Sequence, residues 1–309
     1  MAEEKERIGF ELGMGWLPDY PDFRDYTIEK KGVTSKRAII AGQKDSVKDM
    51  LKKVGAVKTS KTEIPTSIDL RRWCPPIENQ GSIGSCTANA GVGLVEYYER
   101  RAFDRHIDAS RLFLYKTTRN LLGWTGDRGA FIRTTMAAMV LFGIPPERYW
   151  PYVKEDFDKE PSSFCYSFAQ NYQAIQYFRL DSSFTSKKSL LKLIKTLLAF
   201  GLPSMFGFTV FNSIRQARKD GKITFPCLGE KILGGHAVMA VGYDDDIKIK
   251  NTTCGVEKKG ALLIRNSWGT SWGERGYGWL PYEYVLTGLA RDWWTLLKNE
   301  WVNTKKFGL

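Results

Sequence analysis

The sequence predicts an α+β fold in which a mainly helical half precedes a mainly β half. Apolar residues recur at helical spacing between residues 86 and 145, whereas short apolar runs typical of strands dominate from residue 172 onward. A chain of 309 residues, 43% of them hydrophobic, can also bury a substantial core. We therefore expect two lobes or domains.

Three helices are predicted in the first half and one in the second. Helical patterns run from residue 86 to about 101, from about 109 to 122 and from about 129 to 142, where Gly143 and the prolines after it supply a stop. An amphipathic helix is expected near residues 187–200. The rest of the second half reads as strands, with candidates at residues 203–210, 236–243, 260–266, 276–284 and 291–297.

A polar leader of about 63 residues precedes these elements. Residues 16–26 are rich in aromatic residues and proline, which suits an extended segment docked on a surface. Residues 30–61 carry ten Lys or Arg residues against two Asp residues, and we expect a solvated, mobile basic linker there. The pattern of a folded domain begins at Ile64.

Composition narrows the classes of partner and location. The formal charge of +12 raises the question of an anionic surface or a nucleic acid, but no nucleic-acid motif accompanies it, so we expect no such partner. No apolar run approaches 18 residues, so no membrane span is expected. The amino terminus lacks an apolar secretory segment, which favours an intracellular location unless a signal was removed. The five cysteines have no metal-ligand spacing, so we expect no metal or other cofactor; one or two disulfides remain compatible with the count.

Cys86 is the candidate nucleophile. It follows a glycine-rich turn, and a helix starting at Ser85 would place the thiol in its first turn, where free N–H groups and the helix dipole favour the thiolate. We therefore expect a lowered thiol pKa. The alternative for a lone cysteine of this kind is simple packing, so a base and an orienting group must be found elsewhere in the chain.

The chain offers two histidines as the base. His106 lies in a charged stretch between helices and is expected at the surface, whereas His236 follows two glycines at the start of an apolar strand. Alone, His236 could equally be a hydrogen-bonded core residue. Asn266, at the end of another strand, can accept from an imidazole nitrogen and hold the ring towards the thiol, and Trp268 can shield that bond from water.

These residues together resemble the papain family of cysteine peptidases. Gln80, Cys86, His236 and Asn266 occur in that family's order, and Gln80 lies six residues before the cysteine. The matching motifs are Gly84-Ser85-Cys86, Gly235-His236-Ala237 and Asn266-Ser267-Trp268-Gly269, with Ile64 to Arg71 similar to the mature amino terminus and Trp150-Pro151-Tyr152 to a turn between lobes.

The resemblance implies a papain-like two-lobe fold with an active-site cleft between a helical lobe and a β-barrel-like lobe. The leader would span residues 1–63, the lobe carrying the nucleophile residues 64–168, and the lobe carrying His and Asn residues 169–309. The cleft itself would be lined by five residues on two loops: Arg128, Gly129, Ala130, Gly234 and Gly235.

The chain departs from the family pattern at three places. Ile83 replaces a cysteine, which removes half of a disulfide usual in the family, and Thr87 replaces an aromatic residue. The interval from His236 to Asn266 is longer than typical, and residues 244–259 are expected to form a hairpin insertion. The pattern is similar to prokaryotic-type members.

The function implied is a cysteine endopeptidase, made as a zymogen, that cleaves peptide or protein substrates through a thioester. Cys86 would attack, His236 would transfer protons, Asn266 would orient His236, and Gln80 with the Cys86 N–H would hold the oxyanion. Residues 16–26 could lie in the cleft as an inhibitor, or be an arm docked outside it. Two other classes remain open: a non-catalytic binding protein on the same fold, and an acyl transferase or peptide ligase using the same Cys–His pair.

Overall fold

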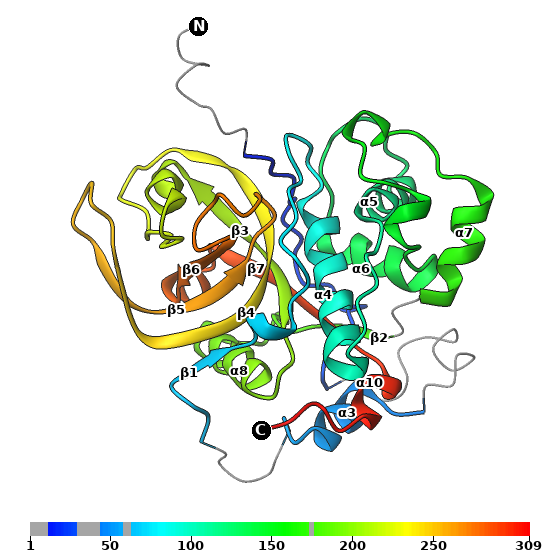
Figure 1. Ribbon diagram of the computed structural model, residues 1–309. Helices are drawn as coiled ribbons and strands as arrows, with labels where there is room; N and C mark the ends of the chain where they lie inside the picture. Colours follow the sequence, from blue (N-terminus) through cyan, green and yellow to red (C-terminus); the bar gives the residue numbers. More distant parts are fainter. Residues whose placement is uncertain (1–11, 30–43, 58–62, 173–175) are drawn as a thin grey trace, which may run out of the picture.

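The computed structural model describes residues 12–29, 44–57, 63–172 and 176–309. Most of the helices gather on one side of the molecule and an antiparallel sheet lies on the other, with a central seam between them (Figure 1). The predicted α+β class is confirmed. No helix in these ranges is long and apolar enough to cross a bilayer.

The helical side contains the three predicted helices close to their predicted bounds. They are α4 (Cys86–Phe103), α5 (Arg111–Leu121) and α6 (Ile132–Leu141). The short helix α7 (Ser163–Ala169), which the sequence pattern did not predict, packs its Cys165 against Phe113 of α5.

The sheet has seven strands, and all its pairings are antiparallel. The strand order is β2-β7-β3-β4-β5-β6, with β1 added beside β4. Among the described residues, β2 and β6 do not pair with each other, so the sheet is open rather than a closed barrel. The strands are β1 (Ser67–Asp69), β2 (Gln176–Arg179), β3 (Ser204–Phe211), β4 (Ile232–Lys250), β5 (Glu257–Arg265), β6 (Tyr277–Pro281) and β7 (Ala290–Leu297).

The five predicted strands are all present, and β1 and β2 were missed. The predicted hairpin over residues 244–259 is confirmed as the outer part of β4 and β5, where Lys248 pairs with Lys259. A disulfide between Cys227 and Cys254 ties the turn of this hairpin to the segment after β3, and the other three cysteines are free and buried. The predicted amphipathic helix is α8 (Lys187–Ala199), which packs against β4.

Helix α4 is the central element of the core. Most of its residues are buried, because it packs against α5 and α6 on one side and β4 on the other. Gly93 also lets α4 lie close to a side chain of β5: a Cβ there would lie 2.7 Å from the guanidinium of Arg265. The amino terminus of α4 is thereby fixed at the seam between helices and sheet.

The prediction of a solvated basic linker is wrong for residues 44–57. Helix α3 (Val47–Lys53) forms there, capped by the Ser46 side chain, which accepts from the Asp49 N–H. Val47, Met50 and Leu51 are buried, and the helix packs beside α10 (Asn299–Asn303). Their helical spacing was masked in the sequence by the surrounding lysines. The rest of the predicted linker lies outside the described residues.

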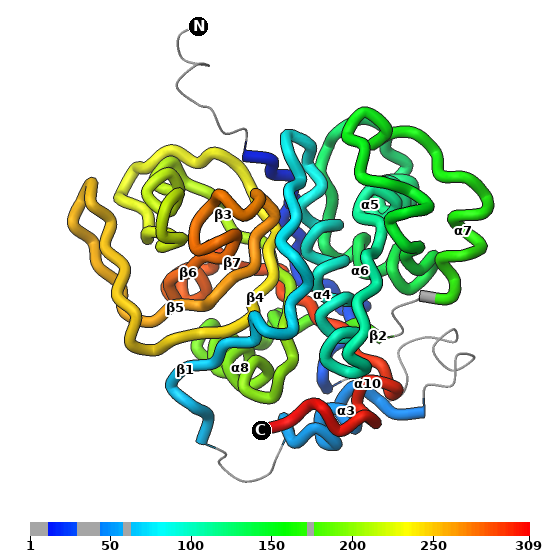
Figure 2. Tube along the Cα trace, in the orientation of Figure 1, coloured from blue at the N-terminus to red at the C-terminus, as the bar shows by residue number. Residues whose placement is uncertain are grey.

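The leader crosses the seam as an extended strand. Residues 12–29, which we call the docked segment, run between the helical side and the sheet (Figure 2). Trp16 forms a parallel bridge with Ala130, just before α6, and Thr27 forms one with Arg179 on β2. The segment therefore contacts both sides of the molecule.

A short helix, α9 (Glu283–Leu286), follows β6 and lies on the sheet side.

Candidate active site

Cys86 is the first residue of α4 and is completely buried. Its Sγ accepts a hydrogen bond from the backbone N–H of Ala237 on β4, at 3.3 Å. The turn before it is held by Tyr152, whose hydroxyl donates to Gln80 O at 3.0 Å and lies 2.6 Å from the Ser85 hydroxyl. Asp127 accepts from the Gly84 N–H at 2.8 Å. Side chains from distant loops therefore fix the turn that presents the thiol.

His236 lies on β4, one residue before the N–H that contacts the thiol. Its Nε2 lies 2.7 Å from Asn266 Oδ1, which is an acceptor, so Nε2 carries the proton in this pair. The Asn266 oxygen also accepts from the Ser267 N–H at 2.8 Å, which fixes the orientation of the amide. Trp268 stacks on the imidazole with ring centroids 4.3 Å apart. His236 Nδ1 is buried and has no hydrogen-bond partner within the described part of the chain. His106, by contrast, is exposed.

Gln80 is buried beside this pair and its amide is fixed at both ends. Its Oε1 accepts from the Ser267 hydroxyl at 2.6 Å, and its Nε2 donates to Ile83 O at 2.9 Å. Met14 O of the docked segment lies 3.5 Å from the same Nε2. Sequence reasoning singled out Gln80. It named Ser267 and Tyr152 only as members of motifs and missed Asp127, since the supporting contacts of these side chains carry no signal until the tertiary structure is known.

The expected lowering of the thiol pKa does not hold for the occluded site. Burial raises the pKa of Cys86 to about 12, although the backbone N–H groups of Ala237, Thr87 and Trp16 act in the opposite direction. Burial likewise lowers the pKa of His236 to about 4, against the hydrogen bond to Asn266. The helix terminus is in place as predicted, but loss of water under the docked segment outweighs its effect. The pair is therefore a neutral thiol and a neutral imidazole in this state.

The docked segment uses the backbone of both cleft walls. Gly235 O accepts from the N–H groups of Gly15 and Trp16, at 3.1 and 3.2 Å. Ala130 N–H donates to Gly15 O at 2.8 Å, and Ala130 O accepts from the Leu17 N–H at 3.1 Å. The segment is thus held as a strand, in parallel alignment with the chain at Ala130.

The remaining predicted cleft residues divide into two kinds. Gly129 and Gly234 lie directly against the segment: a Cβ on Gly129 would overlap the Gly15 carbonyl, and one on Gly234 would lie 2.7 Å from Met14 Sδ. Arg128 is exposed, and its backbone N–H bonds to Gly126 O at 3.1 Å. The indole of Trp268 donates to Gly13 O at 2.8 Å, so the segment also covers the stacked histidine.

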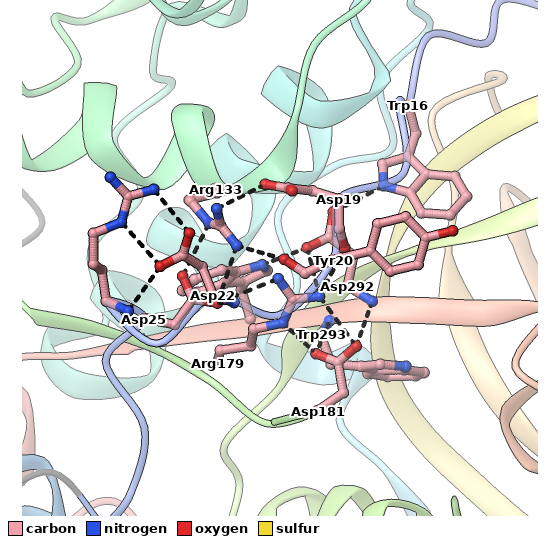
Figure 3. Close-up of polar contacts among 12 residues, drawn as sticks. Trp16, Asp19, Tyr20, Asp22, Asp25, Arg133, Arg179, Asp181, Asp292 and Trp293 are labelled. Atoms are coloured by element: carbon pink, nitrogen blue, oxygen red, sulfur yellow. Dashed lines mark hydrogen bonds and ion pairs between the residues drawn. The ribbon is translucent and has the colours of Figure 1, made fainter. Parts of the chain in front are cut away.

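A cluster of buried and half-buried carboxylates and arginines anchors the segment beyond the cleft (Figure 3). Arg133 of α6 pairs with Asp25 at 2.9 Å and with Asp19 at 3.2 Å. Arg179 of β2, with no side-chain exposure, donates to Asp19 O at 2.9 Å and lies 3.5 Å from Asp25. Asp181, itself almost buried, pairs with the same arginine at 2.9 Å. Sequence reasoning missed this cluster, because its members are up to 162 positions apart.

No group of three His, Cys, Asp or Glu side chains within the described ranges could hold a metal ion. The groups brought together at the seam are the Cys86 thiol, the His236 imidazole, the Gln80 and Asn266 amides and backbone N–H donors. Such a set is suited to nucleophilic attack on a carbonyl and stabilisation of the resulting oxyanion.

Comparisons with known proteins agree with this chemistry. A family model described as papain family cysteine protease matches residues 64–292. The crystal structure of xylellain, a cysteine protease from Xylella fastidiosa, is 32% identical, covers 93% of this chain and 96% of its own, and superposes with a TM-score of 0.68. An uncharacterized peptidase C1-like protein of Acanthamoeba polyphaga mimivirus is 31% identical over 91% of this chain and 86% of its own length.

A more distant structure shares the fold. The ragweed pollen cysteine protease Amb a 11, solved in its proform, is 23% identical, covers 78% of this chain and 67% of its own, and has a TM-score of 0.57. The matched family model covers well over half of the chain, from Ile64 at the start of the folded pattern to Asp292 on β7. The chain therefore belongs to the papain family of cysteine peptidases.

Proposed function

We propose that the protein is a cysteine endopeptidase in which Cys86 forms a thioester with the substrate. The observation that carries this proposal is the joint placement of the Cys86 thiol under the Ala237 N–H and of the neighbouring His236 ring on Asn266, at 3.3 and 2.7 Å. Because Nε2 is committed to Asn266, Nδ1 is the nitrogen left to take the thiol proton. Within the described ranges Nδ1 has no other hydrogen-bond partner, which is consistent with that role.

The reaction follows from these positions. The Cys86 thiolate attacks the substrate carbonyl carbon, and the carbonyl oxygen becomes an oxyanion held by Gln80 Nε2 and the Cys86 N–H. The His236 imidazolium then gives its proton to the leaving amine, and water hydrolyses the thioester with His236 as base. Ser267 keeps the Gln80 amide turned with its N–H₂ group towards the oxyanion, since its hydroxyl occupies Oε1.

A peptide substrate would bind as an extended strand. Ala130 and Gly235 supply backbone donors and acceptors that the docked segment now uses. Gly129 leaves room for another backbone, and Gly234 leaves room for a side chain. A substrate held there by main-chain hydrogen bonds would pair without regard to its sequence, while the side-chain pockets would set its preference.

We further propose that the 309-residue chain is a zymogen. Supporting this, residues 13–17 use the groups that a substrate would need, including Gly235 O, Ala130 N and the Gln80 amide. The family model begins at residue 64, which supports a leader of residues 1–63 and a peptidase part after it. The proform of the ragweed protease is a precedent for a latent state in this fold.

The test is mass spectrometry after incubation with a thiol-directed epoxide, on the full-length wild type, Cys86→Ala and Cys165→Ala. We expect one adduct, at Cys86, in the wild type and in Cys165→Ala, which loses another buried free cysteine, and neither adduct nor casein cleavage in Cys86→Ala. Full casein cleavage by Cys86→Ala would contradict the assignment of the nucleophile.

The zymogen proposal has its own readout in the same samples. New amino termini between residues 30 and 64 should appear in wild type as activity rises, and should be absent from Cys86→Ala if the cut is made by the protein itself. An intact chain with full activity and no such cut would contradict it.

A further inference from the structure

The Trp16 side chain fills a pocket that a substrate side chain could use once the docked segment leaves. The indole is 3% exposed and lies against two glycines on adjacent strands, Gly207 of β3 and Gly235 of β4. A Cβ on Gly207 would overlap the indole, and one on Gly235 would lie 2.8 Å from its Cε3. The missing side chains leave a space the size of a large aromatic ring.

A buried carboxylate lies at the inner end of this pocket. Asp292 of β7 is fully buried, and its Oδ2 accepts from the Trp16 indole N–H at 3.0 Å. Its Oδ1 accepts from the Trp294 indole at 2.7 Å and lies 3.5 Å from Arg179. The indole is thus the donor that the structure gives Oδ2, and removal of Trp16 leaves a buried carboxylate oxygen in need of another donor.

The charges around the pocket disfavour a cation in it. Asp19 and Asp25 belong to the docked segment and leave with it, whereas their partners Arg133 and Arg179 stay (Figure 3). The Arg291 guanidinium carbon also lies 6.0 Å from the centre of the Trp16 ring. A lysine or arginine entering here would meet the three fixed positive charges of Arg133, Arg179 and Arg291. The two carboxylates that stay, Asp292 and Asp181, are both already paired with Arg179.

We infer that this pocket is a specificity pocket of the peptidase, and that Asp292 selects a neutral, two-ring aromatic side chain with an N–H donor, which among the ordinary amino acids is tryptophan. The ring fills the space opened by Gly207, and its N–H replaces that of Trp16 on Asp292. Phenylalanine fits the space but leaves the carboxylate without a donor. The inference rests on the proposed peptidase function.

The central comparison of the test is between tryptophan and an analogue that differs from it in the N–H donor alone. The enzyme is the full-length Trp16→Ala chain, in which the pocket is no longer filled by its own indole. The substrates are fluorogenic peptides with identical flanks that carry Trp, 3-benzothienylalanine, Phe or Lys at one position, scanned over the three residues before the cleaved bond. Benzothienylalanine keeps the shape of tryptophan and replaces N–H by sulfur. At one position we expect kcat/KM for Trp to exceed that for benzothienylalanine at least tenfold, with Lys the poorest.

Two further arms keep the outcome decisive. Adding Asp292→Asn should bring the ratio of Trp to benzothienylalanine towards one. If that variant does not fold, the same four peptides are titrated into full-length chain carrying Trp16→Ala and Cys86→Ala, where Trp should again bind at least tenfold more tightly than benzothienylalanine. The inference is overturned if the Trp and benzothienylalanine peptides have equal kcat/KM or equal affinity at every position, or if the Lys peptide is preferred. Either result leaves the proposed peptidase function standing. Failure to cleave any peptide, together with no epoxide adduct at Cys86, overturns the proposed function itself.

Discussion

Replacing Trp16 by Ala should release the docked segment from the cleft without unfolding the protein. The indole is almost wholly buried and donates to Asp292, so the substitution removes both a large apolar contact and a hydrogen bond to a carboxylate. Truncations of this kind in cores cost about 3–5 kcal/mol. Taking about 3 kcal/mol as the loss, the ratio of released to docked chain should rise on the order of 100-fold.

The assay is the rate at which a thiol-directed epoxide labels Cys86 in the full-length chain. Labelling needs an exposed thiol, so its rate follows the released fraction when docking and release are fast. The chain contains its own control for unfolding, because Cys74 and Cys165 are also free and buried, but not under the docked segment. Release labels Cys86 alone, whereas unfolding labels all three.

A matched variant controls for mutation within the segment. Phe23 lies in the same segment with 93% of its surface exposed, so Phe23→Ala should label at the wild-type rate. Trp16→Phe should fall between wild type and Trp16→Ala, since the ring stays and only the donor to Asp292 is lost. If Trp16→Ala is labelled no faster than Phe23→Ala, the docking energy does not reside in this side chain and the reasoning is refuted.

Three other predictions concern the site and the sheet. Gln80→Ala should leave epoxide labelling of the opened enzyme measurable while lowering kcat about 100-fold, as expected for loss of one oxyanion donor; unchanged turnover would remove Gln80 from that role. Acidification from pH 6.5 to 4 should weaken docking. Burial lowers the pKa of His236 from 6.5 to about 4, so the docked state binds fewer protons than the released state. The free energy of docking therefore becomes less favourable by up to about 3 kcal/mol as pH falls. Amide exchange of residues 12–29, corrected for intrinsic rates, should rise, and an exchange rate that does not change with pH would contradict the prediction. Replacing Cys227 and Cys254 together by Ser should lower the free energy of unfolding by about 3 kcal/mol, measured by denaturant titration, and leave Cys86 labelling unchanged; an unaltered midpoint would show that the disulfide does not stabilise the hairpin.

The elements that could be predicted from the sequence are those with local signals. Helices α4, α5, α6 and α8 follow from apolar spacing and from glycine or proline stops. The family, too, could be recognised, because a few motifs in a fixed order carry it. Helix α3 could not be predicted in this way, since its three buried residues are spread among lysines and gain their burial from tertiary contacts, including those with α10.

The state of the candidate site was less predictable than its members. The sequence pointed to Cys86 and His236, but the direction of both pKa shifts depends on whether water reaches them, and that is decided by Gly13, Met14 and Trp16 far along the chain. The cluster of carboxylates and arginines that anchors the docked segment was equally hard to predict from the sequence. Asp25 and Arg179 are 154 positions apart and carry no mutual signal in one sequence.

In the proposed function, the docked segment and a substrate compete for the same groups, and this competition links the proposed latency to the chemistry. Gly235 O, Ala130 N and the Gln80 amide cannot serve both chains, so any substrate that binds has displaced residues 13–17. That displacement admits water to Cys86 and His236, which removes the burial that now keeps both neutral, and lets the terminus of α4 stabilise a thiolate. The proposed nucleophile is therefore ionised only when a substrate can reach it, because one segment controls access and protonation together.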